Sequence, residues 1–209
     1  MEVLLYIKNL FASSVLFCCI FFFPFDVHGK SFLSQICPGF LKNNEIVDNF
    51  HCVEKNALYR SGQLSVKRLE HYIRKYNIKT IINLRGINEY SSWWQKEHAL
   101  AEKMNIDIYD IAMTAKQFSS KENILLLLKL YEFAPKPILI HCSLGSDRTG
   151  EASALWKLAV ENKSKKEALK QLSLKYLHLK QRYPKKRSFI KMWQGINWLN
   201  NEYDPDLCT

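Results

Sequence analysis

The stretch His-Cys-Ser-Leu-Gly-Ser-Asp-Arg-Thr-Gly, at residues 141–150, combines residue types that could do chemistry. Cys142 stands six positions before Arg148, and glycines and small polar residues fill most of the remaining positions. A branched apolar run, Ile-Leu-Ile, directly precedes the stretch. A core does not need this composition. It is typical of a loop that wraps an anion between the end of a buried strand and the start of a helix.

The backbone of this loop predicts an anion-binding site. Its N–H groups can turn inward together, and Gly145 permits the tight turn and the close approach that this requires. The guanidinium of Arg148 is a planar fork that matches two phosphate oxygens. We therefore expect a bound phosphate to be held by Ser143, Leu144, Gly145, Ser146, Asp147 and Arg148.

Cys142 supplies the reactive group. A thiol that faces several N–H dipoles and a guanidinium is favoured as the thiolate, which is a strong nucleophile. Attack on phosphorus would give a cysteinyl phosphate that water then hydrolyses. We expect Thr149 to donate a hydrogen bond to the sulfur, and His141 to order the loop through its ring rather than to act as the base. The scheme requires no metal and no cofactor.

The motif resembles the signature loop of the cysteine-dependent protein tyrosine and dual-specificity phosphatases. The stretches Leu-Tyr-Arg-Ser-Gly-Gln-Leu-Ser (58–65) and Ile-Lys-Thr-Ile-Ile-Asn-Leu-Arg-Gly (78–86) are similar to the opening of a bacterial and fungal branch of that superfamily. The resemblance covers roughly residues 48–160. It implies that Cys142 is the nucleophile and that Arg148 binds phosphate.

The resemblance also implies a proton donor for the leaving group, and the sequence offers two candidates. In most of the superfamily an aspartate lies on a separate loop about thirty residues upstream, but residues 113–120 contain no acid here. Asp110 falls within a predicted strand. Asp147 lies inside the loop, as in myotubularin-type lipid phosphatases, and repulsion from bound phosphate would favour its protonated form. We favour Asp147 over Asp110; the alternative is that Asp147 only braces the loop.

The substrate stays open at this stage. Bacterial relatives credited with phosphoinositide hydrolysis have lysines where this chain has Ser143 and Ser146, which weakens the case for a multiply phosphorylated headgroup. A phosphorylated protein and a phosphoinositide both remain candidates. Two other readings, a rhodanese-like sulfurtransferase and a non-catalytic phosphate-binding module, explain the motif less well. The first would not need Arg-Thr-Gly to open a helix, and the second would not need Cys142.

The elements that must position these residues follow from hydrophobic periodicity and turn signals. Strands are expected at 49–54, 57–63, 78–86, 106–113 and 137–142. Helices are expected at 64–77 with Ser65 as cap, 88–105, 119–134, 148–162, 165–182 and 187–201. Strands that alternate with helices predict a single α/β domain, with a mostly parallel central sheet flanked by helices. The anion loop would join the last parallel strand to a helix.

The flanking segments differ from this domain in composition. Residues 1–29 have a charged start, an apolar middle and small residues near the end, which predicts an export signal or an N-terminal membrane anchor. Residues 30–47 read as an irregular arm, 48–201 as the phosphatase domain and 202–209 as a C-terminal tail. We therefore expect an exported protein.

The charge distribution and the cysteines bear on the partners of the chain. The chain carries a formal net charge of +10, and residues 157–191 combine 12 Lys/Arg with only Glu161 and Glu167. This basic segment is either a solvated surface or a site of attraction to an anionic membrane surface. No aromatic–basic pattern of a nucleic-acid-binding module is present. No cysteine pair has zinc-finger spacing, and an exported chain could oxidise one pair among Cys37, Cys52 and Cys208.

Overall fold

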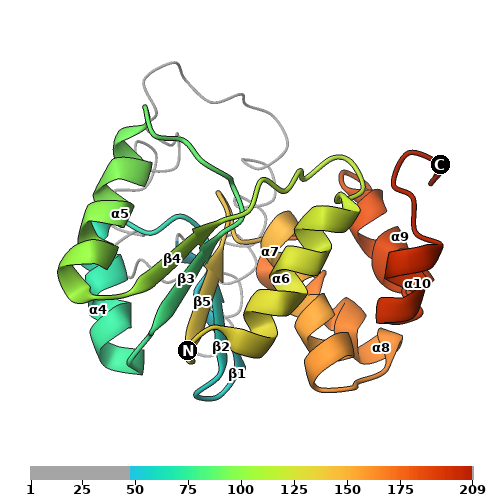
Figure 1. The fold of residues 1–209 in the computed structure, drawn as a ribbon, viewed down its shortest axis with the longest axis horizontal. Helices are drawn as coiled ribbons and strands as arrows, with labels where there is room; N and C mark the ends of the chain where they lie inside the picture. The colour runs from blue at the N-terminus through green and yellow to red at the C-terminus, as the bar shows by residue number, and fades with distance from the viewer. Residues whose placement is uncertain (1–47, 209) are drawn as a thin grey trace, which may run out of the picture. The chain divides into compact units, whose positions relative to one another are not determined.

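A five-stranded sheet lies at the centre of the computed structural model, which describes residues 48–208 (Figure 1). The strands are β1 (His51–Glu54), β2 (Leu58–Ser61), β3 (Thr80–Asn83), β4 (Asp107–Asp110) and β5 (Ile138–His141), in the order β1-β2-β5-β3-β4. β1 pairs antiparallel with β2, and every other pair is parallel. The predicted α/β architecture with a mostly parallel sheet is confirmed.

The three inner strands are buried along their whole length. β3 and β5 are rich in isoleucine, and strands covered on both faces are expected to read as continuous apolar runs. β4 lies at the edge of the sheet, and its residues alternate between exposed and half-buried. The burial pattern therefore places the anion loop, which follows β5, at the middle of the sheet.

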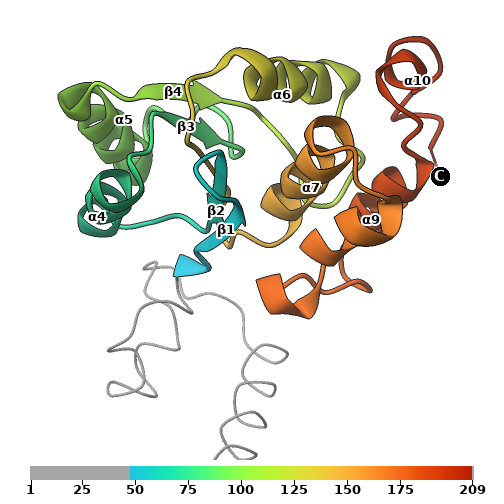
Figure 2. The same ribbon diagram turned by 90° about the horizontal axis from the view of Figure 1, so that it is seen from below.

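Helices cover both faces of the sheet (Figure 2). On one face lie α4 (Val66–Tyr76) and α5 (Ser92–Met104), with a core cluster that includes Leu69, Ile81, Leu100 and Leu139. On the other face lie α6 (Lys121–Phe133) and α7 (Asp147–Leu155), with a larger cluster that includes Ile82, Leu127, Ile140 and Leu155. Alternate residues of β3 and β5 thus serve opposite cores, as the strand period requires.

Local sequence sets the ends of these helices. Ser65 caps α4, since its side chain accepts from the backbone N–H of Arg68, as predicted. Asn77 ends α4 and Asn105 ends α5, each in the left-handed conformation that asparagine tolerates. α7 passes at its end into a π-helical turn, Trp156–Val160.

The predicted continuous helix at 165–182 is wrong. The structure has a short α8 (Lys165–Ala168) and then 3₁₀ turns at Leu169–Gln171 and Leu174–Tyr176. Leu177 adopts a left-handed conformation, with φ 63°, which a continuing helix does not allow. The departure from helix lets this segment follow the surface of the anion loop, as the contacts below show.

The predicted helix at 187–201 is also wrong in its bounds. α9 (Pro184–Met192) begins with the proline at its first turn, where a missing N–H is no loss. Gly195, at φ 105°, separates it from α10 (Ile196–Asn201). Beyond the predicted domain end, Tyr203 is buried and donates its hydroxyl to the carbonyl of Ser119.

The predicted export signal (1–29) and irregular arm (30–47) lie outside the described residues. Within residues 48–208, no helix is both long and apolar enough to cross a bilayer. Cys52 and Cys208 carry free thiols, so they are not bonded to each other, and Cys37 lies outside the described part of the chain.

Candidate active site

The anion loop joins the last residue of β5 to the first turn of α7. The loop begins between two neighbouring strands. His141 is in register with Ser61 of β2 on one side and with Asn83 of β3 on the other. Gly145 has φ 70°, and a Cβ there would stand 2.6 Å from the backbone of Ser61. Any other residue at this position would be both strained and in collision with β2, which agrees with the role expected of this glycine.

The loop presents unpaired backbone donors. Among the residues that the structure describes, no carbonyl oxygen or side chain accepts from the N–H groups of residues 143–148, and the first helical bond of α7 runs from Gly150 to Ser146. Ser143 and Leu144 are exposed, whereas Gly145 to Asp147 are buried. A run of such donors at a helix start forms a concave site for an anion.

Cys142 and Arg148 lie at this loop with few competing partners. Cys142 is 3% exposed and packs in the larger core cluster. The guanidinium of Arg148 donates through Nη1 to the carbonyl of Leu84 at 3.3 Å, and its buried Nε has no partner within residues 48–208. The hydroxyl of Thr149, next along the chain, is likewise buried and unpartnered in that range. These groups are therefore available to a bound ligand.

His141 faces the opposite side of the sheet from Cys142. Its Nε2 lies 3.2 Å from Oε1 of Glu97 on α5, and both side chains are buried. Glu97 also accepts from the side chain of Gln63 at 3.1 Å. Burial would raise the pKa of Glu97, but the charge of His141 and the hydrogen bonds hold it below its ordinary value. This pairing fixes the ring at the base of the loop and leaves His141 a supporting residue.

Arg60 supports the anion loop through hydrogen bonds, and no sequence pattern predicted this role. The side chain is fully buried and donates to the carbonyl of Gly145 at 2.7 Å and to both the carbonyl and the side chain of Gln171 at 2.9 Å. Its guanidinium also lies 4.0 Å from the ring centre of Tyr176. Burial lowers the pKa of Arg60 to about 10, so it remains a cation at neutral pH.

Asn49 is a second brace that no sequence pattern indicated. Its side-chain amide donates to the carbonyl of Leu144 at 2.8 Å and to the carbonyl of Tyr176 at 3.2 Å. One amide nitrogen thus joins the anion loop to the irregular segment after α8. Together, Asn49 and Arg60 explain why residues 171–178 leave the helical path.

The carboxylate of Asp147 contacts two neighbouring side chains. Its Oδ1 lies 2.7 Å from Nδ1 of His178, which is fully buried, and its Oδ2 accepts from the hydroxyl of Ser146 at 3.1 Å. The Asp147 side chain keeps 10% of its surface exposed. His178 was not among the predicted site residues, because no spacing in the Lys-rich segment marks it.

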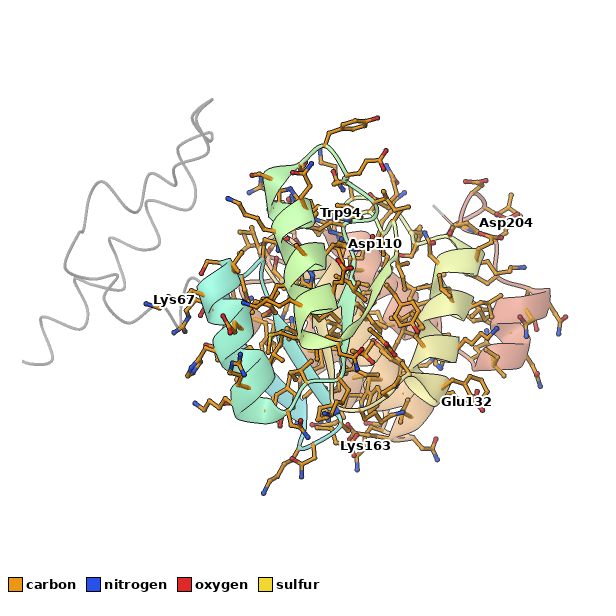
Figure 3. The ribbon with its side chains drawn as sticks, turned by 60° about the vertical axis from the view of Figure 1, so that its left-hand side comes forward. Lys67, Trp94, Asp110, Glu132, Lys163 and Asp204 are labelled. Atoms are coloured by element: carbon orange, nitrogen blue, oxygen red, sulfur yellow. The ribbon has the colours of Figure 1, made fainter. Side chains whose placement is uncertain are left out.

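Asp110 lies elsewhere. Its carboxylate accepts from the side chains of Asn83 at 2.6 Å and Trp94 at 2.9 Å, and His98 lies 3.1 Å away; Figure 3 shows Trp94 and Asp110 side by side. Trp94 and His98 belong to α5. The Asp110 carboxylate therefore lies on the same face of the sheet as the side chain of His141, which contacts Glu97 of α5. Cys142 packs with the opposite core. The structure therefore brings Asp147, and not Asp110, into the loop with Cys142.

Comparison with known proteins gives a family match. The family model described as "DSP-PTPase phosphatase fused to NAD+ Kinase" matches residues 41–191. A search of curated proteins finds no match.

Three solved structures with a similar fold illustrate the likeness. TpbA of P. aeruginosa is 17% identical, with a TM-score of 0.57, over 70% of this chain and 86% of its own. The catalytic core of SIW14 of S. cerevisiae, described as a PP-IP phosphatase, is 22% identical, with a TM-score of 0.58, over 70% of this chain and 86% of its own. A putative phosphatase of Shewanella putrefaciens CN-32 is 16% identical, with a TM-score of 0.57, over 72% and 92%. At these identities, the likeness concerns the fold.

Proposed function

Since the chain belongs to the DSP-PTPase family of cysteine-dependent phosphatases, we propose that it hydrolyses phosphomonoesters through a phosphorylated Cys142. The observation that carries this proposal is the loop itself. Within residues 48–208, backbone N–H groups without an acceptor, the unpartnered Nε of Arg148 and the Cys142 thiol all belong to one short segment between β5 and α7. That arrangement binds a tetrahedral anion and places a nucleophile beside it.

The first step forms the S–P bond. The phosphoryl oxygens lie against the loop N–H groups and the Arg148 fork, which hold the charge that spreads over them in the transition state. The thiolate of Cys142 attacks phosphorus in line with the ester oxygen. The P–O bond breaks, and the leaving oxygen takes a proton from a neighbouring acid.

We assign that acid to Asp147. It lies within the loop, and its carboxyl is oriented by His178 and Ser146. In the second step the same carboxylate accepts a proton from water as the water oxygen attacks phosphorus. The S–P bond breaks, and inorganic phosphate leaves. The Thr149 hydroxyl, unpartnered within residues 48–208, donates to the departing thiolate.

The substrate classes to test follow from the proposed chemistry and from the proteins with a similar fold. A TpbA variant has been crystallised in complex with pTyr, and SIW14 is described as a PP-IP phosphatase. We therefore propose a phosphorylated substrate, with phosphotyrosine peptides and phosphoinositides as the first classes to test. The basic segment 157–191 supports attraction of either anionic substrate.

Trapping the intermediate tests this proposal. The full chain is mixed with p-nitrophenyl phosphate, quenched in acid during turnover and analysed by peptide mass spectrometry. We expect a phosphoryl group on the peptide that carries Cys142. Phosphate on another side chain, or no turnover of p-nitrophenyl phosphate, phosphotyrosine peptide or phosphoinositide, would contradict the proposed function.

A further inference from the structure

Arg85, the second residue after β3, has a fixed and partly exposed side chain. Its guanidinium stacks on Trp93, with the carbon 3.5 Å from the ring centre, and Nη1 donates to the side chain of Gln63 at 2.7 Å. Its backbone N–H donates to the side chain of Asn83. These contacts hold the guanidinium in place, and within residues 48–208 most of its five N–H donors have no acceptor.

This fixed guanidinium lies beside the anion loop. Gln63, which holds it, also donates its backbone N–H to the carbonyl of Ser143 at 2.9 Å. On the other side, Arg148 donates to the carbonyl of Leu84, the residue that directly precedes Arg85. The two arginines therefore border the same loop, one from its helix end and one from the neighbouring strand.

The charges of the two arginines are not balanced. Within residues 48–208, neither Arg85 nor Arg148 forms an ion pair with a carboxylate, whereas Arg68 pairs with Asp48 and Arg74 with Glu70. Burial first, and then the charge of Arg148, lower the pKa of Arg85, while Cys142 and Glu97 act in the opposite direction. Two neighbouring cations without a counter-ion are stabilised by an anion that contacts both.

We propose that Arg85 is a second anion-binding group, and that the substrate carries a further phosphate or similar anionic group next to the phosphate that is cleaved. The inference rests on the proposed phosphatase function and specifies its substrate. The loop itself carries no cation for this group, because serines stand at 143 and 146. Arg85 supplies one from the segment after β3 instead.

A matched pair of substrates tests the inference. The full chain is assayed with cyclohexyl phosphate and with trans-1,2-cyclohexanediol bisphosphate, which differ only by the adjacent phosphate. We expect wild type to prefer the bisphosphate in kcat/KM, and Arg85→Gln to lower that preference by roughly tenfold to 100-fold, the range for hydrogen bonds to charged groups. Arg85→Lys should keep part of the preference.

Control variants separate a local effect from a general one. Arg74→Gln removes one positive charge from the surface of α4 and should leave the preference unchanged. A preference that survives in Arg85→Gln, or an equal loss for both substrates, would overturn the inference, because Arg85 would then serve only the fold or the loop.

Calorimetry keeps the inference separate from the proposed function. Inorganic pyrophosphate and phosphate are titrated into wild type and Arg85→Gln. Tighter binding of pyrophosphate that depends on Arg85 supports the second anion site even if no phosphomonoester is hydrolysed, in which case the proposed function alone fails. Equal binding of the two anions by wild type contradicts the inference even where hydrolysis is found.

Discussion

Nδ1 of His178 lies 2.7 Å from Oδ1 of Asp147, across a separation of 31 residues. His178 is fully buried, and its other ring nitrogen has no partner among residues 48–208. At this distance the carboxyl and the imidazole are hydrogen-bonded to each other. This contact orients the Asp147 carboxyl at the start of α7 and makes His178 a positioning residue for the proposed acid.

Removing His178 tests that role. We expect His178→Ala to slow hydrolysis of an alkyl phosphate by up to about 10²-fold, because a misplaced acid loses its alignment with the leaving oxygen. His178→Asn should recover part of the rate, since its amide nitrogen replaces Nδ1. The measurement is the pH–rate profile of each variant beside its thermal unfolding. Equal losses in both variants, with an unchanged pH profile, would show a structural role only.

The assignment of the acid itself depends on the leaving group. Asp147→Asn should lower kcat/KM for an alkyl phosphate by roughly 10²–10⁴-fold and for p-nitrophenyl phosphate much less, because kcat/KM reports the step in which the leaving oxygen departs and nitrophenolate leaves without a proton. Asp110→Asn, whose carboxylate faces α5, should have a small and uniform effect. Steady-state kinetics with both substrates decides the matter. A leaving-group-dependent loss at Asp110 alone would move the acid to β4.

The sequence sufficed to predict the parts that depend on local pattern. The apolar run before His141 and the glycine at 145 predicted a strand, a turn and a helix start, because strand burial and positive φ restrict residue type directly. The parallel sheet followed from the alternation of strands and helices.

The supports of the loop could not be predicted in this way. Arg60, Asn49 and His178 contact the loop across separations of 85, 95 and 31 residues, and no local spacing reports such contacts. The helix predicted at 165–182 failed for the same reason. Its residues satisfy a helical pattern, but the burial of Tyr176 and His178 against the loop outweighs their intrinsic helix propensity.

The Glu97–His141 pair makes stability depend on pH. The pKa of Glu97 is lower in the folded chain, so its stabilisation is present above the unfolded value, about 4.3, and is lost as pH falls through the folded value. Glu97→Gln should therefore cost about 1.5–3 kcal/mol near neutral pH, and the cost should shrink in acid. Denaturant unfolding at several pH values measures this.

The control for this prediction lies on the same helix. Glu102→Gln, at an exposed position of α5, should leave stability nearly unchanged at every pH. If Glu97→Gln and wild type differ by the same amount at neutral and acidic pH, the ionised Glu97 is not the source of the stabilisation.

A buried ion pair links α9 to α7. Nζ of Lys186 lies 2.9 Å from Oε2 of Glu151 and 3.0 Å from the hydroxyl of Ser119, and both charged side chains are fully buried. Lys186→Met should cost about 3–5 kcal/mol, because it leaves a buried carboxylate without its cation. The double variant Lys186→Met/Glu151→Leu should recover much of that loss. Additive losses in urea unfolding would show that the two charges are not coupled.

The most direct test of the account replaces the sulfur of Cys142 by oxygen. Cys142→Ser keeps the loop N–H groups and Arg148, which bind the anion, but removes the thiolate that attacks. We predict that this variant binds vanadate nearly as tightly as wild type and loses turnover of p-nitrophenyl phosphate. Turnover above about a tenth of the wild-type rate would contradict the assignment of Cys142 as nucleophile, and with it the cysteinyl-phosphate mechanism.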